Sequence, residues 1–191
     1  MLLAPTVNYD SLKVVLEEIR RTDQHARRVL LDSVGLDSPY ASLYIEKLNQ
    51  VDARNLKEVS AILEKYGWIG RSQIGELAAD AIFLVIQHSD LETMQKWLPA
   101  FKEQVSMNEA SGLNFALAYD RFLMWSGKRQ MYGTQASTSV RANNELVIWP
   151  IEDVGNVNAR RKEIGLIDTI EDYARGLGAR YDPEEKLPVK H

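Results

Sequence analysis

Apolar residues recur every three or four positions in three stretches of this chain, 10–33, 72–88 and 113–126. This spacing places them on one face of an α-helix, which constrains the fold more than any other feature of the sequence. Each stretch also carries one titratable side chain on its apolar face, and these are Asp23, His88 and Asp120. Such groups are unfavourable in a protein interior unless they meet hydrogen-bond or charge partners. The sequence therefore predicts three helices whose polar side chains converge on one cluster.

Further helical patterns fill most of the remaining chain. They cover approximately residues 41–49, 52–65, 90–107, 156–164 and 168–176. Ser72 and Asp90 are expected to cap two of the helices, because a short polar side chain accepts hydrogen bonds from the exposed N–H groups of a first turn.

Two segments closer to the C-terminus have an extended pattern instead. Arg129–Gln135 and Glu145–Trp149 are typical of short strands joined by a polar loop. An isolated hairpin is only marginally stable in water, so it must lie on the helices. We therefore expect a mainly α-helical fold: an antiparallel helical bundle-like core (about 10–126), with a small β-hairpin and short C-terminal helices (about 129–178).

Length, composition and charge bound the class of protein. The 191 residues, 45% hydrophobic and 26% charged, suit one soluble domain spanning 1–191, whose charged tail, 182–191, is expected to be disordered. The net charge of -4 argues against a nucleic-acid partner.

No apolar run reaches transmembrane length, so we expect no membrane insertion. The cytoplasm is slightly favoured over export, although the apolar Met1–Thr6 leaves a trimmed export signal open. Oligomeric state is undetermined.

Several kinds of site are excluded or disfavoured. The chain has no cysteine, which excludes disulfides, thiolate zinc sites and a cysteine nucleophile. It contains no His-x-x-x-His pair, no glycine-rich phosphate loop and no Gly-x-Ser-x-Gly motif. We therefore expect no metal site and no cofactor.

His88 and the two aspartates are the candidate catalytic residues. Histidine titrates near neutrality without help, so His88 would be the acid/base, with Asp23 or Asp120 orienting it. Arg27, one helical turn after Asp23, and Arg121, beside Asp120, would bind an anionic group. A structural interpretation is also open. In it the histidine ends a helix, Asp23 and Arg27 form a local ion pair at the edge of the core, and Asp120 with Arg121 fastens neighbouring helices.

The segment 130–135 is dense in uncharged hydrogen-bonding groups. Because alternate residues of a strand share a face, Gln130, Tyr132 and Thr134 would point the same way. That arrangement suits the binding of a polar ligand and equally the docking of a hairpin onto helices. The candidate ligand-binding residues are Arg27, Gln87, Arg121, Gln130, Tyr132, Thr134 and Gln135.

Several short motifs follow one another in a distinctive order. They are Asp23-Gln24-x-x-Arg27, Tyr66-Gly67-Trp68-x-Gly70, Gln87-His88-x-Asp90, Asp120-Arg121, Gln130-x-Tyr132-Gly133-Thr134-Gln135, and Pro150-Ile151-Glu152-Asp153 followed by Arg160-Arg161 and Gly165-Leu166. Over about residues 12–166 the chain resembles a family of uncharacterised bacterial proteins, a domain of unknown function. The resemblance implies a bacterial origin and a shared polar site, and it brings no established reaction.

Two functional hypotheses follow. In the first, the polar residues line one cleft centred on His88 that binds a small polar or peptide-like ligand, with His/Asp acid–base hydrolytic chemistry as an extension; whether the chain is an enzyme stays open. In the second, the chain is a non-catalytic protein–protein interaction module. Its polar cluster is then a structural network, and the surface of Trp68, Trp97 and Trp125 contacts a partner.

Overall fold

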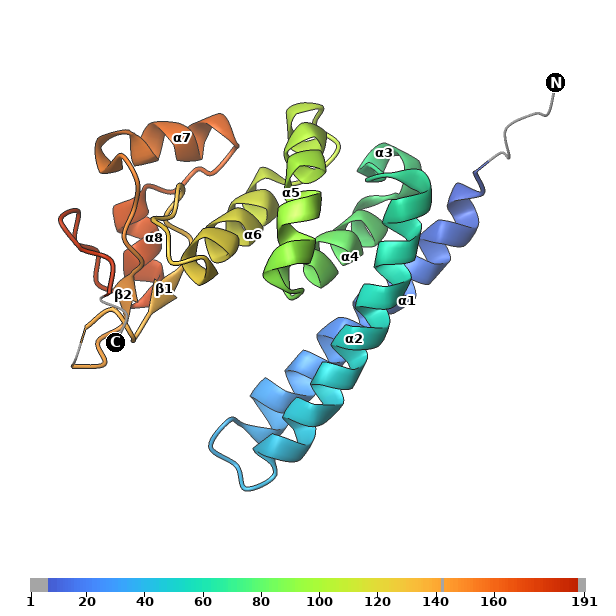
Figure 1. The fold of residues 1–191 in the computed structure, drawn as a ribbon, viewed down its shortest axis with the longest axis horizontal. Helices are drawn as coiled ribbons and strands as arrows, with labels where there is room; N and C mark the ends of the chain where they lie inside the picture. Colours follow the sequence, from blue (N-terminus) through green and yellow to red (C-terminus); the bar gives the residue numbers. More distant parts are fainter. Residues whose placement is uncertain (1–6, 142, 189–191) are drawn as a thin grey trace. The chain divides into compact units, whose positions relative to one another are not determined.

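Helices dominate the computed structural model, which describes residues 7–141 and 143–188 (Figure 1). The expected mainly α-helical class with a small two-stranded hairpin is confirmed. The chain forms two compact units, one ending at Ser89 and the other beginning at Asp90. The single domain predicted from the sequence stays a prediction, and the segment Met1–Thr6 lies outside the described residues.

The first unit begins with two long helices joined by a turn. α1 (Tyr9–Arg28) continues directly into a π-helix, Val29–Val34, and α2 (Ala41–Tyr66) then packs along α1. The two separate helices predicted for 41–49 and 52–65 are therefore one helix. Neither glycine nor proline stands between them to interrupt the hydrogen bonding.

A broken helix completes the first unit. α3 (Arg71–Ile74) is separated from α4 (Glu76–Gln87) by Gly75, whose φ of 83° lies in the left-handed region. The N-cap of α3 is Gly70, so the prediction of a cap at Ser72 is wrong. α4 packs against both α1 and α2. The resulting core of the unit contains Leu16, Ile19, Val59, Leu63, Ala78, Ile82 and Ile86, which are all buried.

The second unit begins with another helix pair. α5 (Leu91–Ser106) is capped by Asp90, whose carboxylate accepts a first-turn N–H at 2.8 Å, as predicted. α6 (Gly112–Trp125) packs against α5, and the rings of Phe101 and Phe115 meet edge to face with centroids 5.5 Å apart. These contacts give the pair an aromatic core.

Short elements follow the helix pair. They are β1 (Ala136–Ser137), β2 (Val147–Ile148), a 3-10 turn (Val154–Asn156), α7 (Val157–Glu163) and α8 (Ile170–Leu177). Their apolar side chains share one buried cluster, which consists of Ile148, Ile151, Val157, Ile170 and Ala174. This cluster gives the hairpin the support that an isolated pair of strands lacks.

The hairpin is much shorter than the sequence pattern predicted. β1 and β2 pair in antiparallel fashion through two residues each, with Ala136 opposite Ile148. The strand predicted for Arg129–Gln135 is wrong, because these residues form a loop, and its consequence, a shared face for alternate residues, is wrong too. Gly133 takes a φ of 76°, which an extended strand does not allow, and a buried carboxylate accepts the N–H groups that a strand ladder would use.

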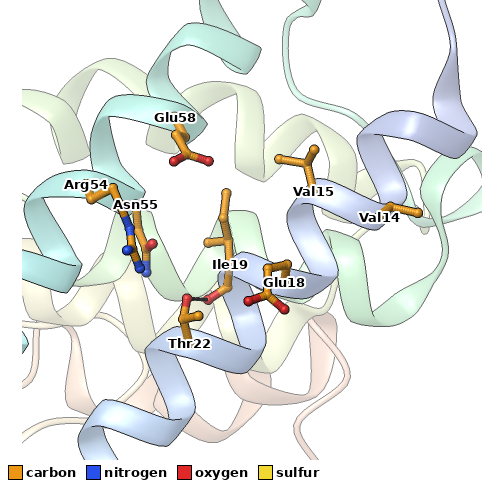
Figure 2. Close-up of a pocket in the computed structure, with 8 residues that line it drawn as sticks. All are labelled: Val14, Val15, Glu18, Ile19, Thr22, Arg54, Asn55 and Glu58. Atoms are coloured by element: carbon orange, nitrogen blue, oxygen red, sulfur yellow. Dashed lines mark hydrogen bonds between the residues drawn. The ribbon is translucent and has the colours of Figure 1, made fainter.

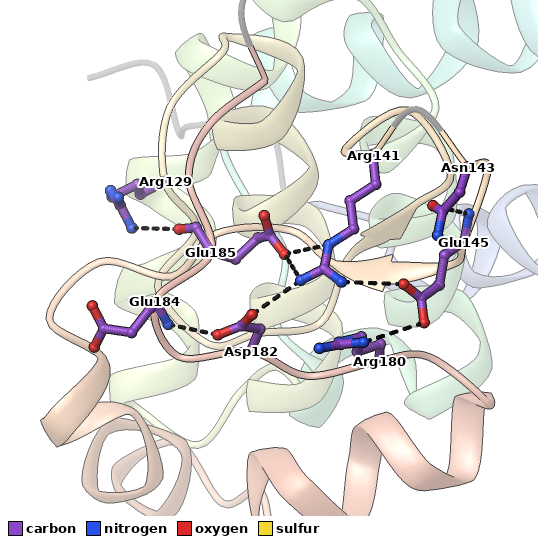
Figure 3. Close-up of polar contacts among 8 residues, drawn as sticks. All are labelled: Arg129, Arg141, Asn143, Glu145, Arg180, Asp182, Glu184 and Glu185. Atoms are coloured by element: carbon purple, nitrogen blue, oxygen red, sulfur yellow. Dashed lines mark hydrogen bonds and ion pairs between the residues drawn. The ribbon is translucent and has the colours of Figure 1, made fainter.

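Described residues of the tail, 182–191, make defined contacts (Figure 3). The Arg141 guanidinium, in the connection between β1 and β2, pairs with Asp182 at 3.0 Å and with Glu185, and it also contacts Glu145 at 3.2 Å. Disorder of the whole tail stays a prediction, since 189–191 lie outside the described residues.

Among the helices that the structure describes, none combines the length and apolar character needed to cross a bilayer.

Candidate functional site

Asp23 lies in the interior of the first unit, where its place in the helical repeat predicted it. It is only 1% exposed, and its carboxylate accepts hydrogen bonds from Arg27 at 3.1 and 3.2 Å and from Gln24 at 2.8 Å. Arg27 also reaches Asp52 on α2 at 2.7 Å. The local ion pair of Asp23 and Arg27 is present, and the same guanidinium also links the carboxylates of two helices.

The surroundings of Asp52 shift the pKa of its carboxyl group. Partial burial raises the pKa above its ordinary value of 3.8, and the nearby Asp23 adds to the rise, while Arg27 opposes it. The folded state therefore keeps this proton to a higher pH than the unfolded state does. Between those two pKa values folding is coupled to proton uptake, and stability falls as pH increases.

We expect this coupling to disappear in Asp52→Asn, which does not titrate. The stability of the wild type relative to Asp52→Asn should decrease as pH rises above about 4, the ordinary aspartate pKa, because only the wild type must then bury a charge. Urea unfolding of both proteins at several pH values measures the difference. A difference that stays constant, or that grows with pH in favour of the wild type, would contradict the assignment.

His88 and Gln87 stand at the C-terminal end of α4. His88 is the C-cap residue and is partly exposed, whereas Gln87 is 8% exposed. Arg121, on α6 of the second unit, is partly exposed and places its guanidinium 5.7 Å from the ring centre of Trp125. The convergence of His88 with Asp23 and Asp120, and the role of His88 as an acid/base, stay predictions.

Asp120, on α6, is the centre of the second unit's polar network. It is fully buried, and its carboxylate accepts hydrogen bonds from the backbone N–H groups of Met131 (2.8 Å), Tyr132 (3.1 Å) and Thr134 (2.9 Å), and from the Thr134 hydroxyl (3.0 Å). Burial raises the pKa of the Asp120 carboxyl, and these hydrogen bonds oppose the rise. Both carboxylate oxygens accept hydrogen bonds, so the group organises the loop that follows α6.

Side chains of α7 and α8 bind the carbonyl groups of the same loop. Arg160 donates to the carbonyl of Met131 at 3.0 Å, and the buried Arg161 donates to that of Tyr132 at 2.8 Å. The Tyr173 hydroxyl donates to the carbonyl of Thr134 at 3.1 Å. The backbone of this loop is therefore held from both sides, by an acceptor on α6 and by donors on α7 and α8.

Gln130 and Gln135, two of the three glutamines predicted to bind ligand, close this loop from within. The Gln130 carboxamide donates to the backbone carbonyl of Gln135 at 2.9 Å and accepts its N–H at 2.9 Å. It donates as well to the carbonyl of Trp149 at 2.6 Å. Gln130 is fully buried, and Tyr132, Thr134 and Gln135 are each at most 8% exposed. The structure thus brings Asp120 and four predicted ligand-binding residues together in one interior network.

A separate hollow lies between α1 and α2 in the first unit (Figure 2). Its volume is about 390 Å³, near the lower end of the range for small-molecule sites. Its lining includes Val15, Glu18 and Ile19 from α1 and Arg54, Asn55 and Glu58 from α2. We call it the α1–α2 pocket.

Asn55 is the most unusual residue of the α1–α2 pocket. It is only 1% exposed, and its side-chain nitrogen, Nδ2, has no hydrogen-bond partner among the residues that the structure describes. A buried donor left in this state costs about 1–3 kcal/mol. Such a residue needs an explanation, and a functional role is one of the recognised ones.

The sequence contained a signal for Asn55 that the predictions above did not use. Asn55 belongs to the same buried face of α2 as Val59 and Leu63, at intervals of four residues. All three residues lie within the helix predicted for 52–65. Their spacing by itself indicates an uncharged polar residue on the buried face.

The structure also bears on the predicted tryptophan surface and on metal binding. Trp68, one of three tryptophans expected to contact a partner, is only 8% exposed, whereas Trp125 is 48% exposed. Trp68 therefore offers little surface to a partner. Within the described ranges, 7–141 and 143–188, no group of three or more histidine or acidic side chains is arranged to bind a metal.

Comparison with known proteins gives one positive result. Neither the curated proteins nor the solved structures contain a match to this chain. Residues 11–186 match a family described as a family of unknown function, DUF6624, and the match includes both the α1–α2 pocket and the Asp120 network. Because the match covers most of the sequence, the chain belongs to this family of unknown function.

Proposed function

We propose that this chain binds a small polar or peptide-like ligand in the α1–α2 pocket, and that the Asp23 and Asp120 clusters support the fold rather than carry out chemistry. The observation that carries the proposal is the buried Nδ2 of Asn55, which has no acceptor within the described part of the chain and belongs to a side chain that lines a hollow of about 390 Å³. An acceptor atom on a ligand would satisfy this donor.

Ligand binding would recover the free energy that an unsatisfied donor costs. Among the described residues the Asn55 donor has no acceptor, at a cost of about 1–3 kcal/mol. A carbonyl or hydroxyl oxygen in the pocket recovers that energy only in the complex, so it contributes to affinity rather than to folding. The terminal amide torsion of asparagine is soft, which allows Nδ2 to turn toward an acceptor placed in the hollow.

The structural role of the aspartates rests on their hydrogen bonds. Asp23 is bound by Arg27 and Gln24, and Asp120 by three backbone N–H groups and a hydroxyl. Neither carboxylate is exposed by more than 1%. A carboxylate that already receives donors on both oxygens has little capacity left to orient a histidine, which favours the structural half of the second hypothesis for these residues.

Asn55→Leu tests the proposal, because it keeps most of the side-chain volume and removes the amide. We expect the free variant to be more stable than the wild type by about 1–3 kcal/mol, since no unsatisfied donor remains. We expect ligand binding to be lost. Asn49→Leu, at an exposed position of the same helix, should change neither property appreciably.

The measurement combines urea unfolding with NMR spectra of the side-chain amide groups. The Asn55 NH2 signals of the wild type should shift when a binding compound from a panel of polar metabolites and short peptides is added. If Asn55→Leu gains stability but still binds the ligand, the proposal is contradicted. So would a panel that leaves the Asn55 signals unmoved throughout.

A further inference from the structure

We infer that the ligand of the α1–α2 pocket carries a primary ammonium group and a carbonyl oxygen next to an apolar side chain, as in an α-amino amide or the N-terminus of a peptide. This inference rests on the proposed function and names its ligand class. Three features of the lining support it: an unpaired carboxylate, a buried amide donor and an apolar wall.

The carboxylate is that of Glu58. In Figure 2 it points from α2 toward Ile19 on α1, across the hollow. Over the ranges 7–141 and 143–188, Glu58 takes part in no ion pair or side-chain hydrogen bond. Glu18, the other acidic residue of the lining, differs because Arg21 holds it at 2.6 Å. Glu58 is therefore available to pair with a ligand cation.

The sign of the ligand's charge follows from the lining as a whole. The lining contains two carboxylates, those of Glu18 and Glu58, and one guanidinium, that of Arg54. The pKa of the Glu18 carboxyl is lowered chiefly by its hydrogen bond to Arg21 and, to a smaller extent, by the charge of Arg54. An anionic ligand would have to approach the unpaired Glu58 carboxylate, which is unfavourable, whereas an ammonium group gains a partner there.

The apolar wall lies on α1. Val14 and Val15, which are 67% and 40% exposed, belong to the pocket lining together with the buried Ile19. Figure 2 shows both valines on α1, the helix opposite Asn55 and Glu58. An aliphatic side chain placed on this wall would remove apolar surface from water, which favours binding.

The two polar side chains of the lining suit one kind of molecule. Its acceptor oxygen would bind Asn55 and its cation would bind Glu58, and an α-amino amide carries both of these groups. The residues Asn55 and Glu58 are three positions apart on α2, so their side chains lie on one helical face. A free amino acid has the ammonium group too, but its carboxylate adds a negative charge near Glu58.

Leucinamide is the probe for this inference, with three neutral or zwitterionic comparators. N-acetyl-leucinamide keeps the amide and side chain without the charge, 4-methylpentanamide lacks the amine, and leucine adds a carboxylate. Each compound is titrated into the full chain, and the Asn55 side-chain amide signals report occupancy of the pocket. We expect leucinamide to bind about tenfold more tightly than the comparators, the effect of one charge-assisted hydrogen bond.

Glu58→Gln provides the matching change in the protein. It should weaken leucinamide binding about tenfold and leave the affinity of the neutral compounds nearly unchanged. Glu46→Gln, at an exposed position of the same helix, should not alter any affinity. Both substitutions are at exposed sites, so loss of folding is not expected, and amide spectra of the free variants verify it.

The outcomes separate the inference from the proposed function. Equal binding of leucinamide and its neutral analogues, or equal binding by wild type and Glu58→Gln, would overturn the ligand class while the pocket itself stood. Binding of some other panel compound, without leucinamide, would do the same. If no compound moves the Asn55 signals, both the ligand class and the proposed function fail.

Discussion

Asp120→Asn is expected to lower the free energy of unfolding of the second unit by about 3–5 kcal/mol, because it leaves more than one buried donor without a partner, at about 1–3 kcal/mol each. The wild-type carboxylate accepts three backbone N–H groups and one hydroxyl. An asparagine offers one acceptor oxygen and turns an NH2 group toward the remaining donors. Those donors stay buried without partners.

Two measurements check this expectation. Urea unfolding gives the free energy, and amide hydrogen exchange at Met131, Tyr132 and Thr134 locates the change, since these three N–H groups should exchange faster in the variant. Glu103→Gln, at an exposed position on α5, is the matched control. A loss below about 1 kcal/mol, typical of ordinary surface substitutions, would show that the loop does not depend on this carboxylate.

Gly133→Ala should be nearly as damaging, for two independent reasons. Gly133 has a φ of 76°, which costs an alanine about 1–2 kcal/mol. Its added methyl carbon would stand 2.4 Å from Cδ1 of Ile170 and 3.0 Å from Cδ1 of Ile151, and such overpacking costs about 1–3 kcal/mol. We therefore expect a total loss of about 2–5 kcal/mol in urea unfolding.

Substitutions at two other glycines of the second unit distinguish the backbone cost from the cost of overpacking. Gly165 has a φ of 85° with no atom within 4 Å of an added methyl carbon, so Gly165→Ala should show the backbone cost alone. Gly155 lacks both the positive φ and close neighbours, and its substitution should be nearly neutral. Three equal losses would contradict the account given for Gly133.

A second-site change tests the crowding directly. Ile170→Val removes the Cδ1 atom nearest to the new methyl group. Alone it should cost about 0.5–1.5 kcal/mol, as such truncations do in a core. Combined with Gly133→Ala it should cost less than the sum of the single changes, because residues in contact are coupled. Strict additivity would place the cost of Gly133→Ala in its backbone alone.

Asp120→Asn and Gly133→Ala are both expected to destabilise the protein because both disturb the 130–135 loop. Its N–H groups are bound by Asp120, its carbonyls by Arg160, Arg161 and Tyr173, and its glycine is packed against α8. Few atoms of the loop are exposed, so a ligand has little access to it. The α1–α2 pocket differs, because there the buried amide donor of Asn55 has no partner among the residues that the structure describes.

Much of the helical fold was predictable from local patterns. Apolar spacing identified the helices that contain Asp23 and Asp120, and it placed both residues on buried faces. Asp90 was identified as an N-cap because capping depends only on the next few residues. The pairing of Asp23 with Arg27 was likewise implied by their separation of one helical turn.

The tertiary structure alone decided what happens between helices. The alternating pattern of Arg129–Gln135 favours a strand, but Asp120, more than ten residues earlier, captures its N–H groups and Arg161, from α7, binds a carbonyl. Likewise, the sequence makes Asn55 a residue of α2, and only the packing of α2 against α1 leaves Nδ2 beside a hollow with no partner in the described ranges. Helix spacing and caps depend on neighbours within a few residues, and a single chain carries that information locally. Which donor meets which acceptor across the fold depends on three-dimensional distances, and those exist only once the helices have packed.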